Sequence, residues 1–212
     1  EIYYEGFDNF PIGGDMINQA VCMFPVTAGD RTNKSSMYEI AMGCKDPGTA
    51  GGNMTTFSAS IRNELGYTVD NAVSGRDFCM YPGYMKLGNA NANSGGIVIP
   101  AMNGSVAAGG SDVTLSFRAC PWCEYITAGW TLDNPKVKVV VSGADGERTI
   151  TDALVISDRP AGGVIGEDGN AWKSASVVIP ALKPDETIRI LGIGASSMGG
   201  RFLIDEISVV KN

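Results

Sequence analysis

Apolar and polar residues alternate in short runs through the second half of the chain. In Asp112–Ala119, the apolar residues Val113, Leu115 and Phe117 alternate with polar ones, and this period of two is typical of a strand with one buried face. Further strands are predicted at Lys136–Ser142, Arg148–Ile156, Trp172–Ile179, Thr187–Ile193 and Arg201–Val210. The Asp-Gly pair of the turn Gly143–Gly146 predicts a hairpin between two of these runs.

The first half of the chain gives a weaker pattern. It predicts strands at Ile2–Phe7, Tyr84–Leu87, Gly96–Pro100, Ala20–Val26 and Met37–Met42, and it allows a short helix at Ser58–Leu65. Roughly ten short strands without regularly intervening helices favour an all-β fold, a two-sheet antiparallel jelly-roll β-sandwich. Because the chain shows neither an internal repeat nor a linker, we expect a single domain over residues 1–212.

Composition and charge narrow the functional classes. Histidine is absent, which excludes a Ser-His-Asp triad, a Cys-His pair and His-ligated zinc. The net charge is −7 and no basic cluster occurs, so neither nucleic acid nor anionic lipid is an expected partner. No apolar run approaches the ~20 residues that span a bilayer, so we expect no membrane insertion.

The five cysteines are Cys22, Cys44, Cys79, Cys120 and Cys123. An odd number leaves one thiol free unless it pairs with another chain. The CxxC motif Cys120-Pro121-Trp122-Cys123 occurs in thiol-disulfide exchange enzymes, but the residues after it form a poor helix and no βαβ unit is predicted. A local disulfide and two reduced thiols both remain open.

Several phrases of the sequence resemble bacterial extracellular jelly-roll modules. YYEGFDNF is similar to their first strand, GYMKLGNANANSGGIVIPAM followed by DVTLSFRA to their middle, and WKSASVVIPAL with GRFLIDEISVV to their last strands. Such galactose-binding-like or carbohydrate-binding-module-like sandwiches occur on surface glycan-utilisation proteins of gut bacteria. The resemblance implies a two-sheet jelly roll, a secreted or cell-surface location and a structural calcium ion. The chain also opens directly on strand-like residues, as a trimmed mature product does, although a cytoplasmic protein fits that as well.

Two carboxylates fall on apolar faces of predicted strands. Glu5 alternates in phase with Tyr3, and Asp205 with Leu203 and Ile207. A buried carboxylate is costly without a partner, and Ca²⁺ with its six to eight oxygen ligands is one partner for both. In the family that the chain resembles, acids of the first and last strands hold such an ion, which implies Glu5 and Asp205 as metal ligands. The alternative is that both acids stay in water or accept backbone N–H bonds.

Three aromatic residues follow one another closely at and after the CxxC motif, in what we expect to be a long loop. They are Trp122, Tyr125 and Trp130. Exposed rings on loops stack on sugars, so we expect these three and Tyr84, beside a Pro-Gly turn, to bind ligand. For Trp172, at the start of a strand, we expect burial, and burial is the alternative for the other rings too.

No carboxylate pair suited to glycoside hydrolysis is recognisable. The strand motif Glu-x-Asp-x-x-Glu of jelly-roll hydrolases is absent, and Asp205 and Glu206 point to opposite faces of their predicted strand. We therefore expect no enzymatic activity and interpret the chain as a glycan-binding module or a surface glycan-binding protein. A structural or adhesion module with a protein partner is the main alternative, and a thiol-disulfide or polysaccharide-active enzyme is a third.

Overall fold

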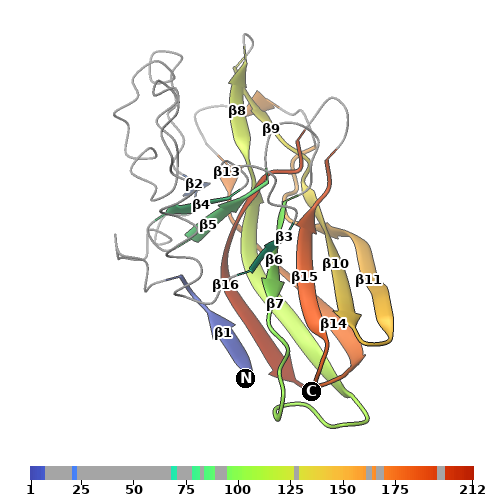
Figure 1. The fold of residues 1–212 in the computed structure, drawn as a ribbon. Helices are drawn as coiled ribbons and strands as arrows, with labels where there is room; N and C mark the ends of the chain where they lie inside the picture. The colour runs from blue at the N-terminus through green and yellow to red at the C-terminus, as the bar shows by residue number, and fades with distance from the viewer. Residues whose placement is uncertain are drawn as a thin grey trace, which may run out of the picture.

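The computed structural model describes residues 1–7, 21–22, 68–70, 78–81, 84–88, 95–126, 129–160, 164–165, 170–194 and 199–212. Only the backbone is described at positions 21–22, 68–70, 78–81, 123–126, 129–131, 164–165 and 170–171. Every regular element in these ranges is a β-strand (Figure 1). The strand predicted at Met37–Met42 and the helix at Ser58–Leu65 lie outside the described residues.

Three long strands lie side by side in one sheet, which we call sheet I. They are β7 (Ser111–Pro121), β14 (Lys173–Leu182) and β16 (Phe202–Lys211). Shorter strands continue the sheet beyond β16, namely β5 (Tyr84–Leu87), β4 (Phe78–Tyr81) and β1 (Tyr3–Glu5). The order is β14-β7-β16-β5-β4, and β1 also pairs with β16. The first strand therefore pairs with the last.

The second sheet, sheet II, has the order β11-β10-β15-β6-β3. Its strands are β3 (Thr68–Asp70), β6 (Gly96–Ile99), β10 (Lys136–Gly143), β11 (Gly146–Val155) and β15 (Thr187–Gly192). All of its pairs are antiparallel. The predicted hairpin is confirmed, because Gly143 lies opposite Gly146 and only two residues connect them. Gly146 has a φ of 106°, which a residue with a side chain rarely adopts.

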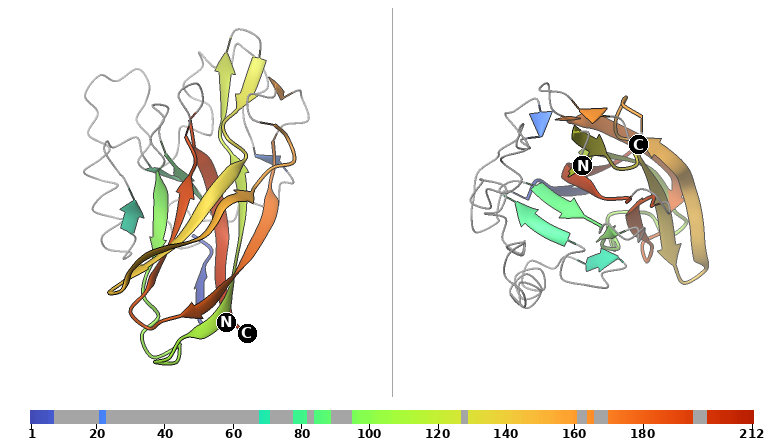
Figure 2. Two further views of the ribbon diagram at one scale, coloured as in Figure 1. Left: turned by 90° about the vertical axis from the view of Figure 1, so that its right-hand side faces the viewer. Right: turned by 90° about the horizontal axis from the view of Figure 1, so that it is seen from above.

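The two sheets face each other, which confirms the predicted antiparallel β-sandwich (Figure 2). Between them, Val113, Leu115 and Phe117 of β7 are buried, while Thr114 and Ser116 are not, as the alternation predicts. Sheet II contributes buried valines and isoleucines from β10 and β15 to the same core. Burial of each large apolar side chain contributes about 1.5–3 kcal/mol, so this interior is the main source of stability.

Small strand pairs lie outside the two sheets. β8 (Cys123–Ile126) and β9 (Gly129–Leu132) form a hairpin that β12 (Val164–Ile165) extends, and β13 (Asn170–Ala171) pairs with β2 (Val21–Cys22). Our expectation of a long loop after the CxxC motif is therefore wrong. The aromatic and β-branched residues of this segment favour strand instead. The hairpin lies at the end of the sandwich opposite to the two termini (Figures 1 and 2).

A bulge in β16 changes the face to which its acidic residue belongs. The register against β7 shifts between Asp205 and Ser208, and Glu206 has a φ of 48°. Before the shift, Asp205 lies opposite Arg118, on the outer face of sheet I, whereas Ile207 beyond it is in the core. The expectation that Asp205 and Ile207 share a face is thus wrong, because a bulge inserts one extra residue and reverses the alternation.

Candidate ligand-binding face

A second apolar cluster lies on the outer face of sheet I, away from the main core. Cys120 and Leu203 lie opposite each other on β7 and β16 and are buried, and three aromatic side chains pack against them. These are Tyr84, Trp122 and Trp172, each partly buried. We call these five residues the aromatic cluster. Its rings come from three distant parts of the chain, which only the sheet brings together.

Trp172 packs within this cluster and is partly buried, so it is less buried than predicted. Its ring meets that of Tyr84 edge to face, with centroids 5.5 Å apart and an interplanar angle of 75°, a favoured aromatic geometry. The guanidinium of Arg118 lies 6.0 Å from the Trp172 ring centroid. Arg118 is also 3.6 Å from the Glu206 carboxylate. The ring therefore has aromatic and cationic neighbours but keeps an exposed part.

Trp122 lies between the end of β7 and the start of β8, and two cations approach its ring. The Lys86 Nζ is 5.5 Å from the ring centroid and the Arg201 Cζ is 5.9 Å from it. Both basic side chains are buried, and a desolvated cation–π contact is worth about 2 kcal/mol. The indole is therefore held in place by charge as well as by packing.

Arg201 is itself held by a carboxylate. The Asp133 Oδ2 accepts hydrogen bonds from the Arg201 Nε at 2.7 Å and from its backbone N–H at 3.0 Å, and Oδ1 accepts one from Nη2 at 2.8 Å. This bidentate geometry is the strongest form of the Arg–carboxylate interaction. Sequence reasoning missed the pair, since the two residues are 68 positions apart and no pattern in the sequence connects them.

Two of the four aromatic residues predicted to bind ligand, Tyr84 and Trp122, lie together in the aromatic cluster. The other two, Tyr125 and Trp130, lie opposite each other in the register of the β8–β9 hairpin. Their side chains are outside the described part of the structure. The binding role of all four stays a prediction.

The two predicted calcium ligands lie on different strands of sheet I. Glu5 is opposite Ile207, and its Oε1 accepts the backbone N–H of Phe7 at 2.6 Å. Asp205 is 1% exposed, so it does not remain in water. Among the described residues, no group of three or more His, Cys, Asp or Glu side chains lies close enough to hold an ion. Calcium at this pair needs further oxygen ligands and stays a prediction.

Cys120 is disulfide-bonded and buried. Its partner is one of the other four cysteines, whose side chains are outside the described residues. For Cys120, the open choice between a disulfide and a reduced thiol is thereby resolved. A reactive thiol needs partial exposure and an electropositive surrounding, so the burial of Cys120 argues against thiol-disulfide exchange here.

No protein-family model matches this chain, and no curated protein matches it in sequence. Several solved structures are similar in fold. The K3 cleaved adhesin domain of Lys-gingipain from Porphyromonas gingivalis has 14% identity and a TM-score of 0.43, and the match covers 68% of this chain and 90% of that one. Within the described residues, no helix has the length and apolarity needed to cross a membrane.

Two carbohydrate-binding modules are also similar. The CBM22-1 xylan-binding domain of Xyn10C from Paenibacillus barcinonensis has 14% identity and a TM-score of 0.36, with 69% of this chain and 81% of that chain covered. A CBM4 structure has 16% identity and a TM-score of 0.36, with 70% and 96% covered. All of these neighbours are distant in sequence, and the similarity is one of fold alone.

Proposed function

We propose that the protein is a non-catalytic glycan-binding module and that the aromatic cluster is its ligand site. The observation that carries the proposal is the gathering of Tyr84, Trp122 and Trp172 on the outer face of sheet I, outside the main core and not fully buried. A purely structural role would be served by burying these rings between the sheets. Partly exposed rings on one sheet face instead offer apolar surface against which the faces of sugar rings can stack.

The expected affinity is modest. Each stacked ring contributes on the order of 1 kcal/mol, if aromatic pairs are a guide, and two or three rings then give weak binding. Because packing and cations already hold the rings, little conformational entropy is lost when ligand binds. Weak binding suits a module that acts beside others through avidity.

The acids near the cluster support a binding role rather than catalysis. Asp133 is engaged in a bidentate pair with Arg201, and Glu206 lies near Arg118. A glycosidase needs one carboxylic acid and one carboxylate on either side of the scissile bond, and both must be available to the substrate. Asp133, whose two carboxylate oxygens both bind Arg201, does not meet this requirement.

The disulfide supports a secreted or cell-surface location, which we include in the proposal. Cys120 is buried beneath the aromatic rings and is oxidised. Structural disulfides persist in oxidising compartments and are rare in the cytosol. The location can be tested by fractionating cells and probing the fractions for the protein.

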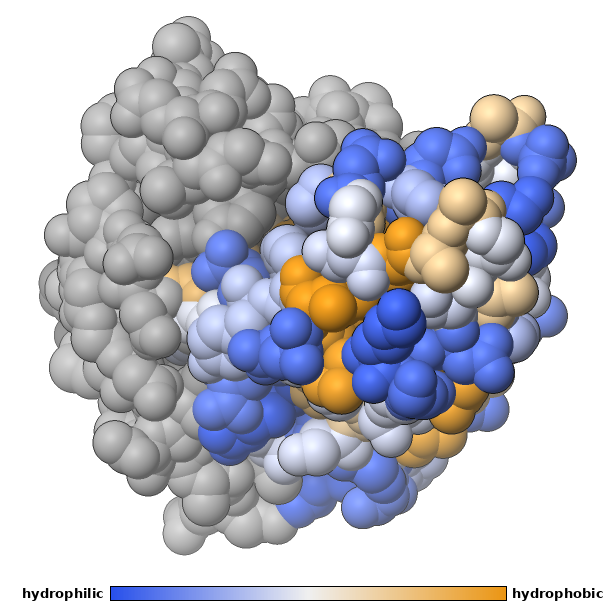
Figure 3. Space-filling model, turned by 90° about the horizontal axis from the view of Figure 1, so that it is seen from below, coloured by the Kyte–Doolittle hydropathy of each residue, from blue (hydrophilic) through white to orange (hydrophobic). Residues whose placement is uncertain are grey.

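A protein-binding adhesion module is the second candidate, and the other end of sheet I favours it. On the outer face, Val178 and Val210 both lie opposite Thr114 and are 54% and 39% exposed, and Tyr4 is 53% exposed. Exposed apolar surface of this kind can mark a contact with another protein. Seen from below, the molecule shows apolar residues interrupted by hydrophilic ones (Figure 3), and such a mixed surface is weaker evidence than the aromatic cluster.

A glycan array with the wild-type protein tests the proposal, followed by titration of any retained glycan. Trp122→Ala and Tyr84→Ala are expected to weaken binding, whereas Val178→Ser, at the opposite end of the sheet, leaves it unchanged. If the wild-type protein retains no glycan, the proposed function is wrong. If Val178→Ser abolishes binding and the aromatic variants keep it, the site is misplaced.

A further inference from the structure

Trp122 takes part in a closed set of hydrogen bonds at the base of the β8–β9 hairpin. The backbone N–H of Trp122 donates to the backbone carbonyl of Arg201 at 2.9 Å. The backbone carbonyl of Trp122 accepts the backbone N–H of Asp133 at 2.8 Å. The Asp133 carboxylate completes the set by accepting the Arg201 N–H at 3.0 Å. Three segments of the chain are thereby joined at one point.

The same three residues also fix the direction of the hairpin. The last register pair of β8 and β9 is Cys123 opposite Leu132, so the hydrogen bond between Asp133 and Trp122 continues the ladder by one step. Arg201 comes directly before β16, the strand that pairs with β7, β5 and β1. The hairpin is thus tied at its base to a central strand of sheet I.

The ion pair in this arrangement is almost completely removed from water. The side chains of Arg201 and Asp133 are 9% and 5% exposed. A buried ion pair gives little stability beyond what apolar residues of equal volume would give, because both charges lose their hydration. The pair can matter more through the neighbours that it holds in place, and one of them is the Trp122 ring, whose centroid is 5.9 Å from the Arg201 Cζ.

We propose that Asp133 and Arg201 are positioning residues of the glycan site. They fix the Trp122 indole and the β8–β9 hairpin, which carries Tyr125 and Trp130, before the ligand arrives. This inference rests on the proposed function. A rigid site loses less conformational entropy on binding, so releasing the indole is expected to weaken glycan binding about tenfold.

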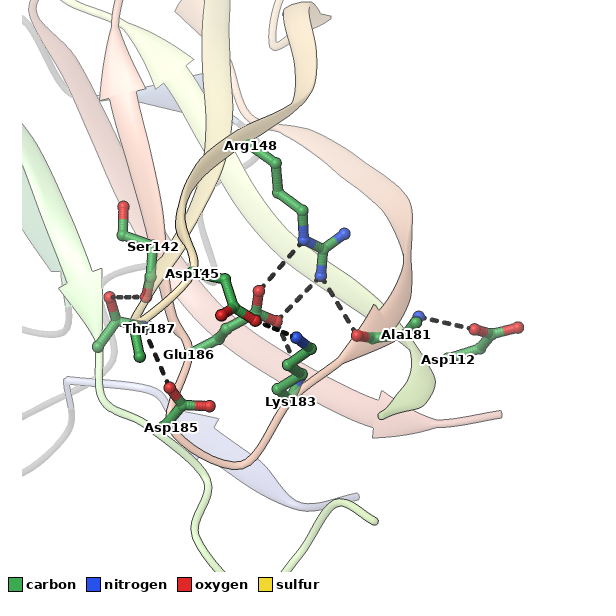
Figure 4. Close-up of polar contacts among 10 residues, drawn as sticks. Asp112, Ser142, Asp145, Arg148, Ala181, Lys183, Asp185, Glu186 and Thr187 are labelled. Carbon is green, nitrogen blue, oxygen red and sulfur yellow. Dashed lines mark hydrogen bonds and ion pairs between the residues drawn. The ribbon is translucent and has the colours of Figure 1, made fainter. Parts of the chain in front are cut away.

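The test compares Asp133→Asn with Glu186→Gln as a matched control. Glu186 is also a buried acid that holds an arginine, Arg148, through two hydrogen bonds (Figure 4). That pair joins β11 to the turn between β14 and β15, and it has no contact with the aromatic cluster among the contacts described. Both variants are expected to lower the melting temperature. Only Asp133→Asn is expected to weaken glycan binding.

Fluorine NMR supplies a second measurement that does not depend on a ligand. The chain has three tryptophans, so 5-fluorotryptophan gives three resonances, which Trp→Phe variants assign. In Asp133→Asn, the Trp122 resonance is expected to shift and broaden, and in Glu186→Gln it stays unchanged. If Asp133→Asn does not fold, Arg201→Lys replaces it, because lysine keeps the positive charge near the ring but cannot form the bidentate pair. A smaller shift and a smaller broadening of the Trp122 resonance are then expected.

The outcomes separate the inference from the function on which it rests. If Asp133→Asn loses stability but keeps both its glycan affinity and its Trp122 resonance, the pair is purely structural and the inference is wrong, while the glycan site stands. If no glycan binds the wild-type protein, the proposed function fails, and the ligand role of the pair fails with it, whatever the resonance shows.

Discussion

Glu186 accepts two hydrogen bonds from Arg148, from Nε at 3.3 Å and from Nη2 at 3.0 Å. It also accepts the backbone N–H of Lys183 at 2.8 Å. Lys183 in turn pairs with Asp145 in the β10–β11 turn, and Ala144 of that turn donates its N–H to Asp185. Contacts of Glu186, Asp145 and Asp185 therefore join the β10–β11 hairpin to the turn between β14 and β15 (Figure 4).

The environment of Glu186 predicts how the stability of the protein depends on pH. Burial raises the pKa of Glu186, but the hydrogen bonds from Arg148 and the Lys183 amide, with the charges of both side chains, outweigh it and leave the pKa below its ordinary value of 4.5. A depressed pKa contributes stability that is present above the unfolded value and is lost as the pH falls through the folded one. The urea concentration at the midpoint of unfolding is therefore expected to decrease as the pH is lowered below 4.5.

Urea denaturation at neutral and acidic pH checks this prediction. Glu186→Gln should lower stability at neutral pH and flatten the decline in acid. Asp152→Asn is the control, because Asp152 is an exposed partner of Lys138 at 3.7 Å, and exposed pairs contribute about 0–1 kcal/mol. An equal pH dependence in wild type and Glu186→Gln would contradict the role of this acid.

The two kinds of aromatic position should differ in their effect on stability. Phe117 is in the main core, and Phe117→Ala is expected to cost about 3–5 kcal/mol. Trp122→Ala removes the packing on Cys120 and Leu203 and the contacts with two cations, but part of the ring is already exposed, so the variant is expected to cost less than Phe117→Ala, about 2–3 kcal/mol. Chemical denaturation measures both. An equal loss for the two variants would place Trp122 in the core and argue against a ligand site there.

Calcium binding at Glu5 and Asp205 is expected to appear as a change in melting temperature. A ligand that binds only the folded state stabilises it by about 2.7 kcal/mol at a hundredfold excess over Kd. Chelator should therefore lower the melting temperature of the wild-type protein, and calcium should restore it. Asp205→Ala should abolish the response. A wild-type melting curve that chelator leaves unchanged would exclude this ion.

The disulfide of Cys120 should contribute to stability. Removing a native disulfide costs about 2–5 kcal/mol in small secreted domains, and this one starts from Cys120, a buried member of the aromatic cluster. Reductant is expected to lower the melting temperature of the wild-type protein. The same reductant should have a smaller effect on Cys120→Ala, which has already lost the bond. Equal effects would mean that the reductant acts elsewhere.

Simple alternation predicted much of the sandwich. Tyr84–Leu87 is a strand with the predicted bounds, and β7, β10 and β16 lie within two residues of theirs. In β7 the burial alternates as the hydrophobic period predicts, whereas β5, β10 and β16 each contain consecutive buried residues on both faces. The same reasoning failed for β16 beyond Asp205, because a bulge depends on tertiary contacts that no local pattern records.

The candidate site was only partly predictable for a similar reason. Composition and local clustering pointed to Trp122 and Tyr84, but the position of Trp172 beside Tyr84 arises from the pairing of β14, β7, β16 and β5. Asp133 and Arg201 carried no signal at all, since each is an ordinary charged residue next to a strand. Their meeting is a product of the fold, and a single sequence contains no trace of it.

Gly192 and Gly200 approach each other closely beside Arg201. Gly192 ends β15, and a Cβ atom built there would overlap the carbonyl oxygen of Gly200. Gly200 is the residue before Arg201. Because backbone cannot move aside as the end of a flexible side chain can, Gly192→Ala is expected to displace Gly200 and with it Arg201.

Gly192→Ala is therefore expected to lower the free energy of unfolding by about 1–3 kcal/mol, as overpacking does. It is also expected to weaken glycan binding, because the displaced Arg201 no longer holds Trp122. Gly109→Ala is the matched control, since a Cβ atom at Gly109 meets nothing within 4 Å, and neither property should change. Denaturation and glycan titration measure the two effects. A Gly192→Ala protein with full stability would show that the two backbone segments have room to separate, and then the position of Arg201 would not depend on this contact.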